Sequence, residues 1–340
     1  MPEDAHKLDT NNPHADALKS AETLYESYCK KDANWERHAV ESGVTIDLLH
    51  DPALPLPVFR GNAIYDAISP LEYYSVVRNK DLRFLWDERF EKGQLIARLD
   101  DKHALLVHPS MKGHLFVSPR DFCIAVDTHF EHDTQGNVNR ILSVFVSVKD
   151  DRVPLVSGYV RGHIYLSAWD IRLDEHGKCC VSYVTAVDVN GYIPRWMLNK
   201  VMVHTPVCVS RIVSVLGKYG APPFVINRHG LIVQDEHYVA DTGEWKGYIA
   251  AESNGKNDEA KSKINLMLVI FKGNDKWRKG WSVSIESSSG NPVEATSEFN
   301  NGNVMLEFNS DIAKAGDTFV FVKPRNDNKV VILGKTVSTQ

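Results

Sequence analysis

The feature of the sequence that most limits its fold is a run of strand-like segments with no helix between them. These segments are residues 94–99, 103–108, 121–130, 141–148, 158–173 and 179–188, and turn-forming residues at 133–137 and 174–178 separate some of them. Parallel strands would need crossover connections, usually helices, and the run contains none. The pattern therefore predicts a large antiparallel sheet built from successive hairpins.

Helical patterns lie on both sides of this run. Residues 14–31 carry apolar side chains at helical spacing, and Ser69-Pro70 is a typical helix start, followed by a second short helix near residues 81–86. A long helix is expected over residues 194–218. Its apolar stripe consists of Leu198, Met202, Thr205, Val209 and Ile212. The chain is thus predicted to be an α+β protein.

The last third of the chain has a different pattern. Residues 250–262 are polar, and short strands follow at 264–271, 281–285, 304–308, 318–322 and 330–333. We predict a disordered N-terminus at residues 1–13, a first domain at 14–225, a connecting segment at 226–262 and a small β-sandwich-like domain at 263–340.

Composition restricts the possible partners. The net charge is −5, whereas a dedicated nucleic-acid binder needs a strongly basic surface. Five cysteines without a CxxC pair are typical of reduced thiols in the cytoplasm. The acidic residues 1–4 predict no signal peptide, and the longest apolar run, 266–271, is too short to span a bilayer. We expect a soluble cytoplasmic protein that binds no nucleic acid and contacts membranes only peripherally.

Local motifs in the first domain indicate more closely which fold it adopts. Trp86-Asp87 resembles the "WD" element of START domains, Pro119-Arg120-Asp121-Phe122 their "PRDF" motif, and Gly158-Tyr-Val-Arg161 their "GVIR" strand. Residues 190–199 resemble the family's entry into its last helix. Because these motifs occur in the family's order and spacing, residues 14–225 resemble a START domain.

This resemblance implies a helix-grip fold, in which a curved antiparallel sheet is closed by a long C-terminal helix. It also implies one lipid, such as a sterol, fatty acid or phospholipid, in an apolar cavity between the two. The family transfers or senses lipids and generally catalyses no reaction, so we expect no enzyme and no cofactor. An apolar cavity suffices for affinity, because each buried methylene contributes about 0.8 kcal/mol.

Strand parity and the helix stripe select the expected cavity residues. They are Val126, Phe145, Arg161, Tyr183, Leu198, Met202, Thr205 and Val209. Several animal START proteins have an arginine where this chain has Val126. Because this chain lacks that cation, we expect a ligand with a small or neutral head. Arg161 is either a substitute cation in the cavity or a member of a structural ion pair.

Two further segments suggest how the cavity opens. Residues 149–157 occupy the position of the family's cavity-covering loop, and Val153, Pro154, Leu155 and Val156 form its apolar tip. Pro206 falls inside the expected last helix, where it removes a backbone hydrogen bond. The resulting kink would serve either as a gate or as a static bend.

Other interpretations stay open at this point. A helix-grip cyclase or hydrolase needs an acid–base pair in the cavity, and an adaptor would have a filled one. His129 and His132 face opposite sides of a strand, so no metal site is expected. Residues 272–281 mix cations with Trp277 and Trp281, which suits either an anionic membrane surface or a hairpin with both indoles packed inward.

Overall fold

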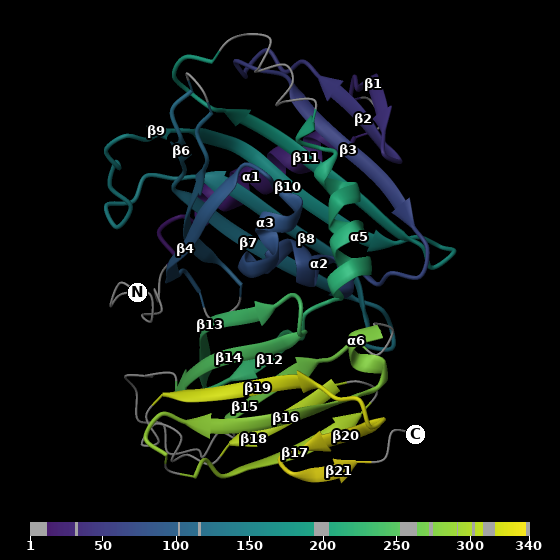
Figure 1. The fold of residues 1–340 in the computed structure, drawn as a ribbon. Coiled ribbons are helices and arrows are strands. Elements are labelled where there is room, and N and C mark those ends of the chain that lie inside the picture. Colours follow the sequence, from purple (N-terminus) through teal and green to yellow (C-terminus); the bar gives the residue numbers. More distant parts are fainter. Residues whose placement is uncertain are drawn as a thin grey trace. The chain divides into compact units, whose positions relative to one another are not determined.

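The computed structural model forms two compact units (Figure 1). It describes residues 12–30, 33–100, 103–114, 117–193, 204–251, 264–271, 275–290, 292–300, 303–308 and 317–337. The first unit comprises Met1–Tyr74 and Arg83–Ser214, and the second comprises Ser75–Leu82 and Val215–Gln340. Residues 75–82 therefore belong to the second unit although they lie within the sequence of the first.

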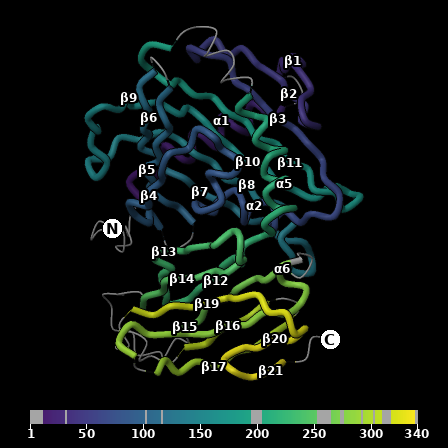
Figure 2. Tube along the Cα trace, viewed as in Figure 1, coloured from purple at the N-terminus to yellow at the C-terminus, as the bar shows by residue number. Residues whose placement is uncertain are grey.

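The first unit is built on one large sheet whose strand order is β1-β2-β3-β11-β10-β8-β7-β5-β6-β9, with β4 paired to β5. The consecutive strands β7, β8, β10 and β11 pair antiparallel with their neighbours, as the sequence predicted. The strands are β1 (Glu36–Glu41), β2 (Val44–Leu49), β3 (Val58–Tyr65), β4 (Phe90–Arg98), β5 (Leu105–Met111), β6 (Arg120–Asp121), β7 (Ile124–His132), β8 (Val138–Ser147), β9 (Val160–Arg161), β10 (His163–Leu173) and β11 (Cys179–Asp188). The chain path in Figure 2 brings β3 and β11 side by side.

Helix α1 (Ala15–Tyr28) covers one face of this sheet, here called the outer face. Its buried residues Leu18, Ala21 and Tyr25 join a core that includes Leu142 and Leu166. The Tyr25 hydroxyl donates to the Asp170 carboxylate at 2.7 Å. The amphipathic helix predicted for residues 14–31 is confirmed.

Helices α2 (Pro70–Arg78), α3 (Lys80–Trp86) and α5 (Cys208–Tyr219) contribute residues to the opposite, inner face, where Tyr73 and Trp86 contact Trp169 and Cys208 lies near Tyr183. Helix α2 begins with a capping box, in which the Glu72 amide donates to Ser69 Oγ at 3.2 Å and the Ser69 amide donates to the Glu72 carboxylate at 2.9 Å. This confirms the helix start read from Ser69-Pro70. The Tyr73 hydroxyl donates to the Val209 carbonyl at 2.9 Å and so joins α2 to α5.

The second unit contains two sheets, ordered β12-β15-β18-β17 and β13-β14-β19-β16-β20-β21. Trp281 of one sheet packs edge-to-face on Phe299 of the other, with ring centroids 5.4 Å apart. The elements are β12 (Phe224–His229), β13 (Leu231–Val239), β14 (Glu244–Ala251), β15 (Ile264–Val269), α6 (Asp275–Arg278), β16 (Gly280–Ser287), β17 (Ala295–Asn300), β18 (Asn303–Phe308), β19 (Thr318–Pro324), β20 (Lys329–Ile332) and β21 (Lys335–Val337).

This unit begins earlier than the sequence indicated. Residues 226–262 were expected to be a connecting segment, but most of β12 and all of β13 and β14 lie within them. Strand β12 pairs with β15, and β14 pairs with β19. Their pairing partners lie about 40 and 70 residues later in the chain, so the local pattern did not reveal them as part of this fold.

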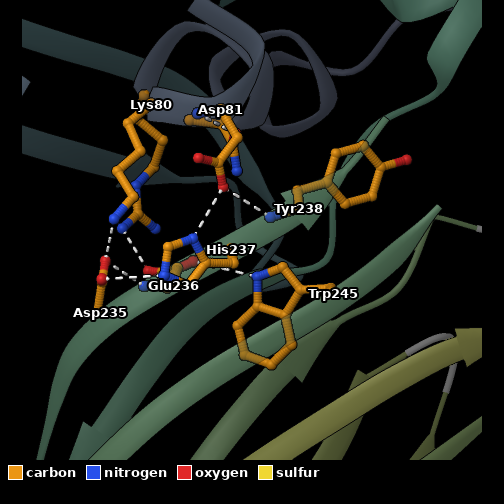
Figure 3. Close-up of polar contacts among 9 residues, drawn as sticks. Lys80, Asp81, Asp235, Glu236, His237, Tyr238 and Trp245 are labelled. Atoms are coloured by element: carbon orange, nitrogen blue, oxygen red, sulfur yellow. Dashed lines mark hydrogen bonds and ion pairs between the residues drawn. The ribbon is translucent and has the colours of Figure 1, made fainter. Parts of the chain in front are cut away.

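Within the second unit, residues 78–81 are bound to strand β13 by a polar network (Figure 3). Lys80 forms an ion pair with Asp235, and the Tyr238 amide donates to Asp81 at 2.8 Å. His237 lies between carboxylates, 3.5 Å from Asp81 and 3.2 Å from Asp235. The end of α2 and the start of α3 are thereby integrated into this unit.

Candidate functional site

The inner face of the large sheet is organised in rows, because residues paired across neighbouring strands point to the same side. One row is Leu105, Val126, Phe145, Ser167, Thr185 and Phe59. The next is Thr128, Ser143, Trp169, Tyr183 and Gly61, followed by Phe130, Ile141, Ile171, Val181 and Ala63. These rows contain aromatic, aliphatic and hydroxyl side chains but no charged one.

Exposure changes along this face. Ile141 and Ile171 are fully buried, whereas other apolar side chains keep accessible surface although they pack against the buried Phe122, Ile124 and Val126. The partly exposed group is Leu105, Val107, Met111, Phe145, Ile164 and Val187. The inner face thus has a filled end and an end lined by apolar surface that other residues leave partly uncovered.

Aromatic rings form the floor at the filled end. Trp169 stacks on Tyr183 with ring centroids 4.1 Å apart, and Tyr73 and Trp86 each lie 6.2 Å from Trp169. Burial raises the pKa of the Tyr73 hydroxyl well above its ordinary value, so it stays protonated and donates to the Val209 carbonyl. Val209, a predicted cavity residue, is fully buried at this contact.

Two groups of hydroxyls interrupt the apolar surface. Tyr74 lies 2.8 Å from Thr128, which lies 2.9 Å from Ser143, and these three hydroxyls satisfy one another. Ser167 donates to the Tyr183 hydroxyl at 3.3 Å. Sequence reasoning selected Tyr183 but missed Ser167 and Trp169, although the alternation within residues 158–173 already places these two on one side of a strand.

Arg161 lies apart from the inner face. Its guanidinium donates to both oxygens of Asp121, at 3.0 and 2.8 Å, and its charge acts on the thiol of Cys123, which belongs to the outer core under α1. His108 also contacts Asp121, at 2.8 Å. The alternative of a structural ion pair therefore describes Arg161.

Three of the family motifs interlock around this ion pair. Arg120 donates to the carbonyls of Val189 and Asn190 at 3.2 and 3.0 Å, while the next residue, Asp121, binds Arg161. A Cβ on Gly162 would lie 2.2 Å from the Phe122 ring, so only glycine leaves room for that ring. The motif residues thus attach the loop that contains Pro154 and the loop that contains Asn190 to the edge of the sheet.

The loop predicted to cover the cavity has a buried base and an exposed tip. Asp150 binds Arg152 at 2.7 Å and His14 at 2.8 Å, and these contacts lower the pKa of Asp150 well below its ordinary value. Val153 is buried in the outer core, Val156 is half-buried, and Pro154 and Leu155 are exposed. Leu155 has an exposed fraction of 79%.

The predicted last helix is interrupted at Pro206, because His204 is helical, residues 205–207 form a turn and helix α5 begins at Cys208. Residues 194–203 of the predicted helix lie outside the described residues. A Cβ on Gly61 would lie 2.7 Å from Pro206 Cβ, which shows how closely this turn packs on β3. Thr205 accepts a hydrogen bond from Arg89 at 3.0 Å. The predicted cavity residues Leu198 and Met202 lie outside the described residues.

Among the described residues of the second unit, one groove with a volume of about 670 Å³ is lined mostly by charged and polar residues: Asp241, Thr242, Glu244, Lys276, Arg278, Lys279, Pro324 and Asn326. Trp277 and Trp281 are 2% and 1% exposed, so both indoles pack inward. Of the two alternatives for residues 272–281, the structure favours packed indoles, and no tryptophan is available for a membrane surface there.

The residues that the structure describes hold neither a metal site nor a membrane-spanning helix. They contain no cluster of His, Cys, Asp or Glu that would hold a metal ion. None of the helices found within those ranges is long and apolar enough to cross a membrane.

Comparison with known proteins gives one family match. Residues 15–216, more than half of the chain, match the model of the START domain family. No curated protein matches the sequence.

Solved structures resemble part of the chain. The human StAR-related lipid transfer protein 5 is 21% identical over 59% of this chain and 94% of its own, with a TM-score of 0.49. Human STARD10 is 18% identical over 56% and 76%, with a TM-score of 0.49. The lipid transfer and protein localization domain of human StarD13 is 20% identical over 56% and 93%, with a TM-score of 0.45.

Proposed function

The chain belongs to the START domain family, and on this premise we propose that it binds one lipid against the inner face of its large sheet and transfers or senses that lipid. The family match supports the general role. The lipid class, which we limit to sterols, fatty acids and phospholipids, is the part to be tested.

The observation that carries this proposal is the partly exposed apolar lining of the inner face. Phe145, Ile164 and Val187 come from three different strands and keep accessible surface beside a buried core. Covering such surface with an alkyl chain is favourable by about 25 cal/mol per Å² removed from water. A chain of 16 to 18 carbons, at about 0.8 kcal/mol per methylene, would need no charged anchor for affinity.

We further propose that two exposed loops make the transient contact with a membrane. Leu155 and Tyr192 each have an exposed fraction of 79%. Arg161 connects their loops, since its side chain donates to the Pro154 carbonyl and its own carbonyl accepts from the Asn190 side chain, both at 2.9 Å. Two exposed side chains, one aliphatic and one aromatic, on loops that both contact Arg161 suit insertion among lipid headgroups.

The same features argue against the alternatives. An enzyme would need an acid–base pair, and the inner-face rows hold no carboxylate, imidazole or amine. Burial raises the pKa of the Cys208 thiol to about 12, which keeps it protonated and a poor nucleophile. An adaptor with a vestigial site would have large side chains covering the surface of Phe145 and its neighbours. The five free cysteines fit a cytoplasmic protein.

Native mass spectrometry of the purified chain, followed by extraction and identification of bound lipid, tests this function. We expect one lipid per chain, and transfer of that lipid between two vesicle populations at a rate that rises with protein concentration. An empty protein that also takes up no sterol, fatty acid or phospholipid from vesicles would refute the proposal and favour the adaptor.

A further inference from the structure

The second unit concentrates positive charge in two segments that lie far apart in the sequence. Residues 272–279 contain four cations and one carboxylate, and residues 323–329 contain three cations and one carboxylate. The whole chain has a net charge of −5, so the rest of it is acidic. A local excess of one sign attracts partners of the opposite sign.

Backbone contacts bring the two segments together. The Asn328 amide donates to the Lys279 carbonyl and the Arg325 amide to the Gly280 carbonyl, both at 2.8 Å. Gly280 pairs with Lys329 across β16 and β20, and a Cβ on Gly280 would lie 2.3 Å from the Lys329 carbonyl oxygen. Only glycine permits this approach, so the connection between β19 and β20 is fixed against the residues that follow α6.

Some of these cations are engaged within the fold. Arg325 forms an ion pair with Asp327, so this pair adds no net charge. Lys276 donates to the Ala240 carbonyl at 2.7 Å and so attaches α6 to the hairpin between β13 and β14. The remaining cations must account for any attraction at the surface.

Four of the remaining cations form what we call the basic cluster: Arg278, Lys279, Lys323 and Lys329. All four side chains are exposed. Within the described part of the chain, none of the three lysines forms an ion pair. Lys323 and Lys329 pair with positions of β16 that are two residues apart, so both lie on the same face of the sheet, one on either side of that strand.

The surroundings of the cluster favour one kind of anionic partner. The neighbouring groove also holds the carboxylates of Asp241 and Glu244, which repel a free phosphate ion. A nucleic acid needs a longer basic track and aromatic rings for its bases, and both nearby indoles are buried, with that of Trp277 donating to the Ala221 carbonyl at 3.1 Å. A membrane with anionic headgroups needs only several exposed cations at its surface.

We propose that the basic cluster adsorbs the second unit to anionic membrane surfaces, by Coulombic attraction to lipid headgroups and without insertion of side chains. Each cation close to an anionic leaflet strengthens adsorption about fivefold, and the attraction extends over roughly one Debye length, about 10 Å. This inference goes beyond the proposed lipid-binding function, because it holds whether or not a lipid occupies the inner face.

Vesicle co-sedimentation of the full chain tests the inference. Vesicles of phosphatidylcholine alone are compared with vesicles that also contain phosphatidylserine, so the difference separates the attraction to anionic headgroups from the contact proposed for the two exposed loops. The variant is Lys279→Gln with Lys329→Gln. The control is Lys19→Gln with Lys30→Gln, at exposed positions in and just after α1, which changes the net charge by the same amount.

We expect the wild-type chain to bind the phosphatidylserine vesicles more tightly, with a preference that shrinks as the ionic strength rises from about 0.05 to 0.5 M. Lys279→Gln with Lys329→Gln should lower this preference about 10- to 30-fold and leave binding to neutral vesicles unchanged. The control variant should keep the wild-type preference. Inorganic phosphate at matched ionic strength should not compete.

Several results would overturn the inference. Equal binding to the two kinds of vesicle, or an equal loss of preference in the variant and the control, would show that the cluster does not select anionic membranes. Competition by inorganic phosphate, or tighter binding to a single-stranded oligonucleotide than to phosphatidylserine vesicles, would identify a different anionic partner. Retention of lipid on the inner face is measured separately, so failure of that function is distinguishable from failure of this one.

Discussion

Arg78 donates to Glu236 at 2.6 Å although 158 residues separate them in the sequence. The first of these residues ends helix α2 and the second lies in strand β13. Helix α2 therefore begins in the first unit, where Tyr74 bonds to Thr128, and ends in the second unit. Residues 75–82 are thus attached to the additional β-sheets of the second unit.

The neighbouring ion pair between Lys80 and Asp235 gives a test of this attachment. Lys80→Glu should place two carboxylates together and lower the free energy of unfolding by about 1 kcal/mol, the upper range for partly exposed pairs. Chemical denaturation of the full chain measures the change. Adding Asp235→Lys should restore most of it, and a double variant no better than the single one would contradict an ionic contribution.

The ion pair between Asp121 and Arg161 predicts a loss of stability in acid. Burial by itself raises the pKa of Asp121, but the hydrogen bonds and charges of Arg161 and His108 outweigh it, so the pKa lies below its ordinary value. Such a carboxyl stabilises the fold above its unfolded pKa, near 4, and the contribution disappears as the pH falls through the folded value.

Asp121→Asn should therefore lower the free energy of unfolding at neutral pH by about 2 to 3 kcal/mol and flatten its decline below about pH 4. Urea denaturation at several pH values measures both effects. Asp151→Asn, at an exposed position in the nearby loop, is the control and should leave the profile unchanged. An equally steep decline in Asp121→Asn would show that other carboxyls cause it.

The exposed leucine at the loop tip predicts a specific loss of membrane contact. Leu155→Ser should reduce vesicle binding roughly tenfold, because an inserted leucine contributes about 1.5 to 3 kcal/mol, part of which the proposed contact recovers. Vesicle co-sedimentation measures it, with lipid transfer as a second readout. Val40→Ser removes an apolar side chain that is 65% exposed elsewhere and should have no effect. Equal losses in the two variants would contradict a role for this loop.

The close approach of Gly61 to Pro206 predicts that added volume displaces the turn before α5. Gly61→Ala would place a methyl group 2.7 Å from Pro206 Cβ and 2.9 Å from its carbonyl oxygen. We expect a loss of about 1 to 3 kcal/mol in unfolding free energy and faster lipid exchange. Gly217→Ala in α5, where a Cβ meets nothing within 4 Å, should be neutral or slightly stabilising. Unchanged exchange in Gly61→Ala would mean that this turn does not control access.

Much of the first unit was predictable because its signals are local. The capping box at Ser69, the periodicity of α1 and the hairpin turns each depend on residues a few positions apart. The motifs around Trp86, Arg120 and Arg161 occur in the order that identifies the family. Strand parity alone placed Val126 and Phe145 on the same face as Tyr183.

Other features depended on which distant residues meet. The role of Arg161 was ambiguous in the sequence, because its position in a strand does not reveal whether a carboxylate such as Asp121 lies beside it on the outer face. The register that places Ser167 beside Phe145 and Trp169 beside Tyr183 is set by pairing across strands. Strand β13 and its contact with Lys80 join segments more than 150 residues apart.

By itself, then, the sequence determined most elements of the first unit, the antiparallel class of the large sheet and the START family, since helix caps, turns and periodicity act over one or two turns of chain. The tertiary structure decided the partner of Arg161, the membership of residues 226–251 in the second unit and the hydroxyl cluster around Tyr183. The physical reason is that ion pairing, strand register and burial are properties of residues brought together by folding, and no local pattern encodes their partners.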